Sequence, residues 1–336
     1  MSLSTLEVFK HIQPRDAVVL TDEQLLDLQK TLNGILRDIA AVCAKHHLRY
    51  FLGGGSALGA IRHHGFIPWD DDIDINMPRE DHDKFVQVFL QEFGAKYWVH
   101  TPEETPGYGL LLSRVLLKGT SVRTREDFHN AECGAFVDIF VIENTYDNIF
   151  LRNIHGFGCM AFGFAQSCRK FFRDRKELMA LAKTAEGDAD KRKQYIRTFR
   201  TKIVLGALLS FASLDTWIRW SDRWYSRCHD GGSRYVTIPA GRGHFYGELY
   251  RREDICEGIL VPYDDMKVSV SKGYDLYLQR LYGDYRKIPE AEDRERHVFF
   301  APFYLHAQSA DSPAQSGDSQ DMDKAESGKA RAELDS

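Results

Sequence analysis

The segment Phe51–Pro78 constrains this chain more than any other, because it joins a glycine turn to a dense acidic run. It reads FLGGGSALGAIRHHGFIPWDDDIDINMP, with four aspartates within five residues (Asp70, Asp71, Asp72 and Asp74). Two carboxylates about 5 Å apart repel by ~3 kcal/mol at an effective dielectric near ~20. Apolar residues flank the run on both sides, so the charges cannot simply spread into water. A bound divalent cation would remove this cost, and ligands that are all oxygen favour Mg²⁺ or Mn²⁺.

The composition predicts a soluble protein that does not bind nucleic acid. The 336 residues are 43% hydrophobic and 28% charged, with a net charge of −5. Seven acidic and three basic residues lie from His306 onward, so the rest of the chain is nearly neutral, whereas a nucleic-acid binder is clearly basic. The six cysteines show no zinc-like spacing, which favours a reduced cytoplasmic protein. The first residues lack the layout of a signal peptide, and no apolar run reaches the ~18 residues needed to span a bilayer.

The pattern of apolar residues predicts an α+β fold: a mixed sheet with flanking helices, a mainly helical insertion and a C-terminal α/β segment. Thr21 and Gln24 fit a capping box before a long amphipathic helix. We expect an N-terminal extension (1–20), a catalytic core (21–145), a basic mainly helical section (146–230), the C-terminal part of the catalytic domain (231–305) and a disordered tail (306–336). Within the core, strands are expected at Arg49–Leu52, Asp72–Ile75, Tyr97–His100, Leu110–Leu117 and Ala135–Ile142, and helices at Ser56–Arg62 and Asp81–Phe93.

The acidic run and the glycine turn suggest one site. On a strand, residues two apart share a face, so Asp72 and Asp74 project together. Gly53–Gly55 let backbone amides approach an anion, and a helix that begins near Ser56 directs its positive end to the same place. A phosphate cradle beside a metal pair predicts phosphoryl or nucleotidyl transfer.

Asp138 is the candidate third carboxylate, because it is a lone acid in the apolar run Ala135–Phe140 and a charge there is costly unless paired or metal-bound. It would bind a metal or take the proton of the nucleophile. Each motif has an alternative: the glycines form a plain turn, the acidic run is a calcium loop or an exposed patch, and Asp138 is a structural acid. Arg62 and His63 are expected either to contact the transition state or to serve as counter-charges to the acidic strand.

The acidic motif and several later segments resemble those of a known family. The stretch LGGGSALGAIRHHGFIPWDDDIDINMPREDHDKF closely resembles the signature of the LicD family, the bacterial phosphocholine transferases related to fukutin, a branch of the nucleotidyltransferase superfamily. LLLSRVLLKGTSVRTRE, CGAFVDIFVIE and VPYDDMKVSVSKGYDLYLQRLYGDYRKIPEAEDRERH resemble later segments of that family. The resemblance covers roughly Leu25–His297 and is weakest through the basic helical section. It implies a nucleotidyltransferase-like sheet. Arg114 and His64 stand where many relatives have lysine.

Carried over residue by residue, the resemblance implies that Asp72 and Asp74 bind Mg²⁺ (or Mn²⁺), with Asp138 as the third acid of the metal and catalytic set. It implies that Gly54, Gly55 and Ser56 hold phosphate. We expect Arg62, His63 and Arg114 to complete the phosphate- and nucleotide-binding set. A choline group would need aromatic faces, for which the candidates are Tyr246, Trp224, Tyr282 and Tyr285.

The resemblance also implies the reaction. Family members use a CDP-linked alcohol donor, such as CDP-choline or CDP-ribitol; a hydroxyl of a cell-surface glycan attacks it and CMP leaves. The expected role is therefore modification of lipopolysaccharide, teichoic acid or capsule, with lipid-linked glycans among the acceptors. Two alternatives stay open: an NTP-dependent nucleotidyltransferase that modifies a small molecule or protein, and an inactive glycan- or nucleotide-binding module.

The basic section Ser167–Lys202 carries twelve Lys/Arg against five Asp/Glu. It is expected either to contact anionic lipid or a charged glycan, or to form a helical cap with a solvated face. The first interpretation gives a cytoplasmic protein that is peripheral to the inner face of the plasma membrane.

Overall fold

The acidic motif lies on a mixed sheet at the centre of the fold. In the computed structural model, which describes residues 17–184, 189–290, 294 and 296–306, this sheet has the order β2-β3-β7-β5-β4, and β8 and β9 continue it from β7. The strands are β2 (Phe51–Leu52), β3 (Asp74–Pro78), β4 (Tyr97–His100), β5 (Ser113–Leu117), β7 (Phe136–Thr145), β8 (Tyr235–Thr237) and β9 (Leu249–Arg251). Only β3 and β7 run parallel among these pairings, and their register places Asp74 opposite Asp138.

Helices cover this sheet, and their local sequences explain where they begin. Helix α2 (Asp22–His46) starts at the predicted capping box, in which Thr21 and Gln24 exchange side-chain and backbone hydrogen bonds. Its apolar stripe is buried, as its spacing predicted, and burying each such side chain contributes about 1.5–3 kcal/mol. The other helices against the sheet are α3 (Gly54–Arg62), α4 (Arg79–Phe93) and α11 (Tyr274–Tyr282).

Short elements from distant parts of the chain close the fold around the sheet. β1 (Ala17–Val18), β12 (Phe299–Tyr304) and β6 (Ser121–Thr124) form a three-stranded sheet, and β10 (Gly258–Tyr263) pairs with β11 (Met266–Ser271). The remaining short helices are η1 (Arg125–Asp127), α9 (His244–Gly247) and α10 (Arg252–Ile255). Pairing of β12 with β6 brings the residues just before β12 next to the acidic motif.

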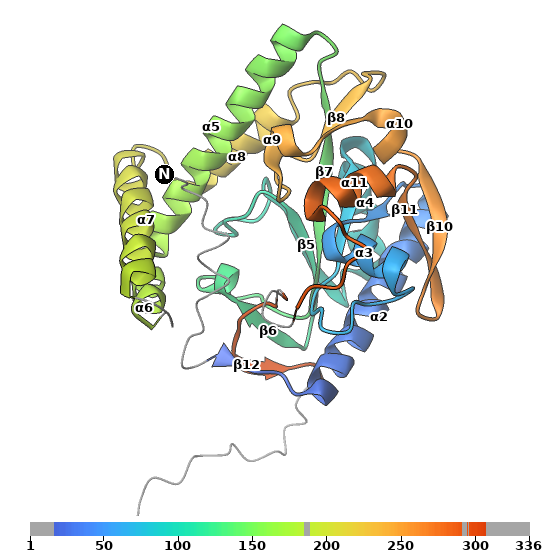
Figure 1. The fold of residues 1–336 in the computed structure, drawn as a ribbon, viewed down its shortest axis with the longest axis horizontal. Coiled ribbons are helices and arrows are strands. Elements are labelled where there is room, and N and C mark those ends of the chain that lie inside the picture. The colour runs from blue at the N-terminus through green and yellow to red at the C-terminus, as the bar shows by residue number, and fades with distance from the viewer. Residues whose placement is uncertain (1–16, 185–188, 291–293, 295, 307–336) are drawn as a thin grey trace, which may run out of the picture. The chain divides into compact units, whose positions relative to one another are not determined.

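The mainly helical section consists of α5 (Ile149–Arg173), α6 (Arg175–Thr184), α7 (Ala189–Leu208) and α8 (Leu214–Tyr225). Figure 1 shows α8 beside α5, and α6 and α7 at the other end of α5. The α+β fold class is therefore confirmed. The described residues up to Leu305 form one compact unit. Almost all of the expected tail (306–336), and residues 1–16 of the expected extension, lie outside the described residues. In the described part of the chain, no helix is both long enough and apolar enough to cross a bilayer.

Two predicted boundaries shift at the motif itself. Helix α3 begins at Gly54, not near Ser56, because Gly53 is its N-cap residue. Strand β3 begins at Asp74, so Asp72 precedes the strand. The predicted alternation holds nevertheless: Ile73 and Ile75 are fully buried, and Asp138 N donates to Ile73 O at 3.0 Å.

Candidate active site

The acidic motif, the glycine turn and the C-terminal residues enclose one pocket of about 730 Å³. The glycine turn, the acidic run and residues of β5 and β7 line it. Residues from 238–282 line it as well, and we call them the far wall because they lie far along the chain. The residues that line it include Gly54, Gly55, Asp70, Asp72, Asp74, Arg114, Asp138 and His297. The structure therefore gathers most of the predicted set in one place.

The glycine turn touches carboxylates directly. Gly54 has φ +45°, and a β-carbon there would lie 2.8 Å from Asp74 Oδ2. A β-carbon on Gly55 would lie 2.9 Å from Asp70 Oδ2. Glycine is thus required so that these acids can approach the positive end of α3, which stabilises them. The amide of Gly54, expected to hold phosphate, donates to the Tyr277 hydroxyl at 3.0 Å.

Ser56 has a different contact from the one expected. It is buried, it is not among the described residues that line the pocket, and its Oγ accepts a hydrogen bond from Asp74 N at 2.9 Å. In this structure the hydroxyl therefore fixes the start of β3 and leaves the phosphate contact to other groups.

The carboxylates of the pocket repel one another. Burial, followed by the charges of Asp72 and Asp138, raises the pKa of Asp74 well above its usual range. Burial and the neighbouring aspartates likewise raise the pKa of Asp70. Burial also raises the pKa of Asp72, although His297 opposes the shift. Carboxylates with such pKa values lack enough positive charge around them, and a cation would supply it.

Arg114 compensates one member of the cluster. Its Nε and Nη2 lie 2.6 and 3.0 Å from the two carboxylate oxygens of Asp138, and its Nη1 lies 3.4 Å from Asp127 Oδ1. The guanidinium stacks on the Phe136 ring, 3.7 Å from its centroid. Burial alone would lower the pKa of Arg114, but Asp138 and other neighbours hold it well above its usual range. Asp138 is therefore an ion-paired acid, and a metal bound there would share its carboxylate with Arg114.

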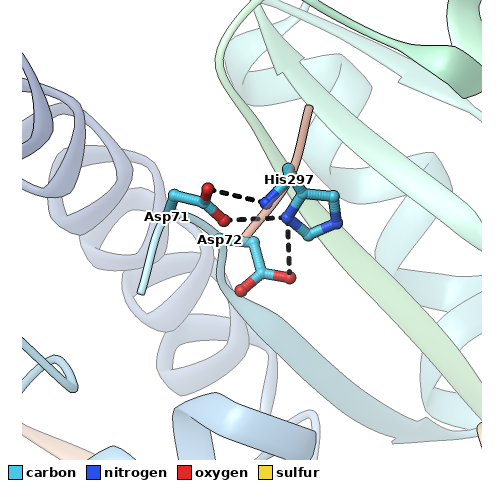
Figure 2. A group of neighbouring side chains, drawn as sticks. All are labelled: Asp71, Asp72 and His297. Carbon is cyan, nitrogen blue, oxygen red and sulfur yellow. Dashed lines mark hydrogen bonds and ion pairs between the residues drawn. The ribbon is translucent and has the colours of Figure 1, made fainter. Parts of the chain in front are cut away.

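His297 and Asp71 form a second group beside the acidic run. The backbone N and Nδ1 of His297 lie 2.9 and 2.8 Å from the Asp71 carboxylate, and Nδ1 lies 3.7 Å from Asp72 Oδ2 (Figure 2). Burial would lower the pKa of His297, but these two acids raise it to about 10, so the ring is cationic at neutral pH. Ligand atoms of Asp71, Asp72 and His297 lie within 4.8 Å of one another, so they could hold a metal ion once His297 has lost its proton.

Arg62 and His63 lie away from the described pocket lining. They end a nine-residue helix whose first residue touches the acids, which places them about 12 Å away along the axis. Arg62 Nη1 donates to the carbonyls of Tyr285 and Lys287 at 2.8 and 3.2 Å, and its Nε donates to His63 Nε2 at 2.9 Å. The structure thus gives this pair contacts with the loop after α11. Burial lowers the pKa of Arg62, and the negative charge of Asp70 opposes that shift, as expected of a counter-charge to the acidic run.

The far wall contains groups that no local motif indicated. Glu248 is only 2% exposed, its Oε1 accepts from Gly243 N at 2.8 Å, and burial raises its pKa to about 7. Tyr282 lines the same wall, with the Arg242 guanidinium 5.8 Å from its ring centroid. Of the four aromatic candidates for a choline cage, Tyr282 alone is among the described lining residues.

The pocket offers donor atoms of the kind that the expected magnesium or manganese ion takes. Asp72 and Asp74 offer oxygen ligands, which hard divalent cations prefer, and their raised pKa values show that charge compensation is incomplete. β3 and its hydrogen-bonded neighbours hold Asp74 in place.

The sheet, the glycine turn and the carboxylate cluster together define an α+β protein with an acidic pocket beside a helix N-terminus. The chain contains a LicD-family domain: the family described as "LicD/FKTN/FKRP, nucleotidyltransferase domain" matches residues 47–155. The resemblance drawn from the motifs is thereby confirmed.

Individual relatives extend this similarity. The chain is 28% identical over 295 residues to the lipopolysaccharide cholinephosphotransferase LicD of Haemophilus influenzae, covering 83% of this chain and 96% of the relative. It is 42% identical over 66 residues to the human ribitol 5-phosphate transferase FKRP, covering 20% of this chain and 13% of the relative. An uncharacterized Rickettsia prowazekii protein is 35% identical over 147 residues, which are 40% of this chain and 46% of the relative.

Proposed function

We propose that this protein transfers phosphocholine, or a related phospho-alcohol, from a CDP-linked donor to a hydroxyl of a cell-surface glycan and releases CMP. The observation that carries the proposal is the pocket in which Asp72, Asp74 and Asp138 meet the glycine turn. Similarity along most of the chain to a lipopolysaccharide cholinephosphotransferase supports the class of reaction and a glycan acceptor.

Asp72 and Asp74 would hold Mg²⁺, which when bound neutralises the diphosphate of a donor and stabilises the departing CMP. The remaining roles belong to the chain. The turn at Gly54 and Gly55 directs the positive end of α3 toward the pocket, where it favours phosphate oxygens. Asp138, oriented by Arg114, either completes the metal ligands or accepts the proton of the attacking hydroxyl.

The far wall suits the alcohol part of a choline donor. The ring of Tyr282 offers a π face, and the buried Glu248 offers a negative charge when ionised. A quaternary ammonium ion is attracted by both kinds of group. A pocket of about 730 Å³ has room for more than a diphosphate, as a CDP-alcohol requires.

A cytoplasmic location, with lipid-linked glycans among the acceptors, belongs to the same proposal. The six cysteines are all free and buried, which agrees with a reducing compartment.

The test is a donor screen with the purified full chain, Mg²⁺ and a glycan acceptor. CDP-choline, CDP-ribitol, CDP-glycerol and CDP-ethanolamine are supplied in turn and CMP release is measured, while labelled NTPs are supplied in parallel and pyrophosphate is measured. We expect CMP from at least one CDP-alcohol. Pyrophosphate without CMP would replace the proposal with nucleotidyl transfer, and donor binding without turnover would indicate an inactive module.

A further inference from the structure

Helix α5 presents an apolar stripe to solvent. Phe150, Ile154, Phe157 and Phe164 recur at three-, four- and seven-residue steps, so they share one side of the helix. Phe157 is 73% exposed and Phe150 is 69% exposed. The opposite side of α5 is buried against the rest of the protein through residues such as Cys159. Large apolar side chains gathered in this way on a surface indicate an interaction site.

Helix α8 packs beside α5 and adds positive charge to the same layer. Arg219, Arg223 and Arg227 are spaced four residues apart and exposed. Among the described residues, no carboxylate forms an ion pair with any of the three. The two acids of α8 are used elsewhere: Asp215 accepts from Gly107 N, and Asp222 accepts from Arg79.

Aromatic rings connect the two helices. Phe162 of α5 lies 6.3 Å from Trp217 and 5.5 Å from Trp224 between ring centroids. Trp217 in turn contacts Trp220 and Phe211, which is 74% exposed. With Arg223 and Arg227, most of these rings line a groove of about 400 Å³. The docking face, as we name it, consists of the α5 stripe, the three arginines, Trp220 and Phe211.

We propose that the docking face binds the surface of an anionic lipid bilayer. Phe side chains can enter the acyl boundary, Trp rings favour the headgroup level, and the arginines attract anionic headgroups. Each basic residue near such a surface strengthens binding about fivefold. A second copy of this chain fits the face less well, because the docking face contains no acidic residue, so a two-fold symmetric contact would leave the arginines of both copies without a carboxylate partner. The inference does not depend on the proposed transfer reaction.

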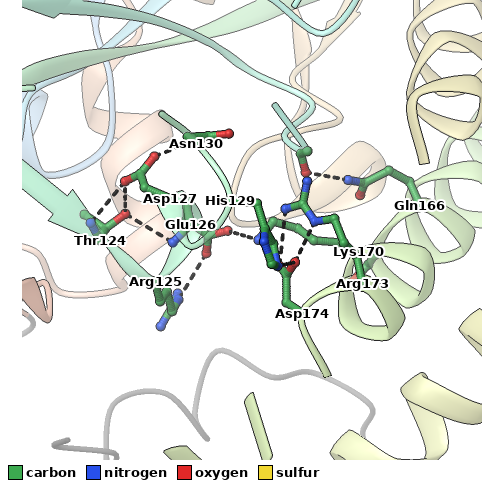
Figure 3. A network of polar contacts seen from close by, with 12 residues as sticks. Thr124, Arg125, Glu126, Asp127, His129, Asn130, Gln166, Lys170, Arg173 and Asp174 are labelled. Atoms are coloured by element: carbon green, nitrogen blue, oxygen red, sulfur yellow. Dashed lines mark hydrogen bonds and ion pairs between the residues drawn. The ribbon is translucent and has the colours of Figure 1, made fainter. Parts of the chain in front are cut away.

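The basic section Ser167–Lys202, from which sequence reasoning expected lipid contact, uses several charges internally. Lys170 lies 2.9 Å from both Glu126 and Asp174, and Arg173 bonds to Asp174 as well (Figure 3). Phe171, an aromatic residue of this section, is buried. These contacts connect α5 to the segment whose Glu126 lines the pocket.

The test is co-flotation of the full chain with vesicles of phosphatidylcholine alone or with one part in three of phosphatidylglycerol. We expect binding that is strongest with phosphatidylglycerol and weakened by salt. The double variant Phe150→Ser/Phe157→Ser should lose at least about tenfold in binding to both vesicles. The double variant Arg223→Glu/Arg227→Glu should lose the preference for the anionic vesicle.

Matched controls are Leu260→Ser, which changes a 70% exposed apolar residue on β10, and Lys267→Glu, which changes an exposed cation on β11. All variants should keep the thermal unfolding midpoint and the CMP release from soluble donor of the parent chain. Failure of the parent chain to float, equal flotation of the phenylalanine variant, or equal loss in the controls would overturn the proposal. So would a dimer of the parent chain, without vesicle binding, that the phenylalanine variant converts to monomer.

Discussion

The acidic pocket and the docking face place opposite kinds of residue in unfavourable surroundings. The pocket holds Asp70, Asp72 and Asp74 where burial and mutual repulsion raise the pKa of each carboxyl. The docking face holds Phe150 and Phe157 in water. Each arrangement costs free energy in the isolated chain, and each cost would fall on contact with matching chemistry: a cation in one case and an apolar boundary in the other. Buried carboxylates therefore identify the pocket, and exposed phenylalanines identify the docking face, although a cation and a lipid surface share no chemistry.

The largest effect is expected from the acids themselves. Asp72→Asn and Asp74→Asn should each lower turnover by on the order of 100-fold or more, because each removes charge that would hold the metal. Both variants should fold, since the substitution relieves repulsion. The measurements are CMP release and calorimetric titration with Mn²⁺, with the exposed Asp265→Asn as control. If a variant kept a large fraction of turnover, the substituted aspartate would not be part of the active site.

Gly54→Ala tests whether the turn exists to accommodate a carboxylate. The substitution combines a positive φ with a close approach of 2.8 Å to Asp74 Oδ2, whereas Gly119→Ala has a positive φ of +77° and open space around the new methyl group. Backbone strain should cost both variants about 1–3 kcal/mol in the free energy of unfolding. Only Gly54→Ala should also lose turnover. Equal behaviour of the two variants in denaturant melts and in CMP release would mean that the contact with Asp74 is unimportant.

Arg114→Lys should destabilise the protein by about 1–3 kcal/mol, because a lysine cannot reproduce the two-point contact with Asp138 in a buried site. The control Arg37→Lys changes an exposed pair with Asp265 and should cost at most about 1 kcal/mol. Chemical denaturation measures both. If Asp138 needs Arg114 for orientation, turnover should fall in the first variant while donor affinity changes little. A parallel fall in affinity would instead assign Arg114 to donor binding.

The smallest effect is expected at the far wall and depends on pH. Burial holds the pKa of Glu248 at about 7 in the folded state, against 4.5 for the ordinary side chain. Between these values the unfolded chain has lost the proton that the folded chain keeps, so the free energy of unfolding should fall as pH rises from about 4.5 to 7, by roughly 1–3 kcal/mol. Below this window both states are protonated and the penalty is absent.

Glu248→Gln should remove that decline, and the exposed Glu253→Gln should leave it unchanged. Thermal or denaturant melts at several pH values measure the slope. An unchanged slope in Glu248→Gln would show that the carboxyl ionises in the folded protein as easily as in water.

Local spacing predicted the core of the site because its parts are neighbours in sequence. The alternation of Ile73 and Ile75 with the acids identifies the beginning of a strand with one buried face. The glycines stand about 17 residues before these acids. Spacing did not show which partner a side chain meets. Ser56 was expected at phosphate, but its Oγ accepts from Asp74 N. Arg62, expected either at the transition state or as a counter-charge to the acidic strand, donates to carbonyls of the loop after α11.

Other parts of the site come from far along the chain. His297 is 226 residues from Asp71, and Glu248 belongs to a segment without any acidic pattern. Only the folded arrangement brings these side chains together. The apolar stripe of α5 has a regular period, but a period alone does not tell whether a helix face is covered, and here it is exposed.

The parallel register of β3 and β7 has a consequence for engineering. A slip of one residue between these strands would turn one of the two facing acids, Asp74 or Asp138, to the opposite side of the sheet. Insertions or deletions of one residue within either strand should therefore abolish turnover. Residues 238–282 are tied to the acids as well, because β8 just before them pairs with β7 and Tyr277 accepts a hydrogen bond from Gly54 N at 3.0 Å. Chimeras that graft this segment from relatives, in order to change donor selectivity, should therefore keep Tyr277 and the pairing of β8 with β7.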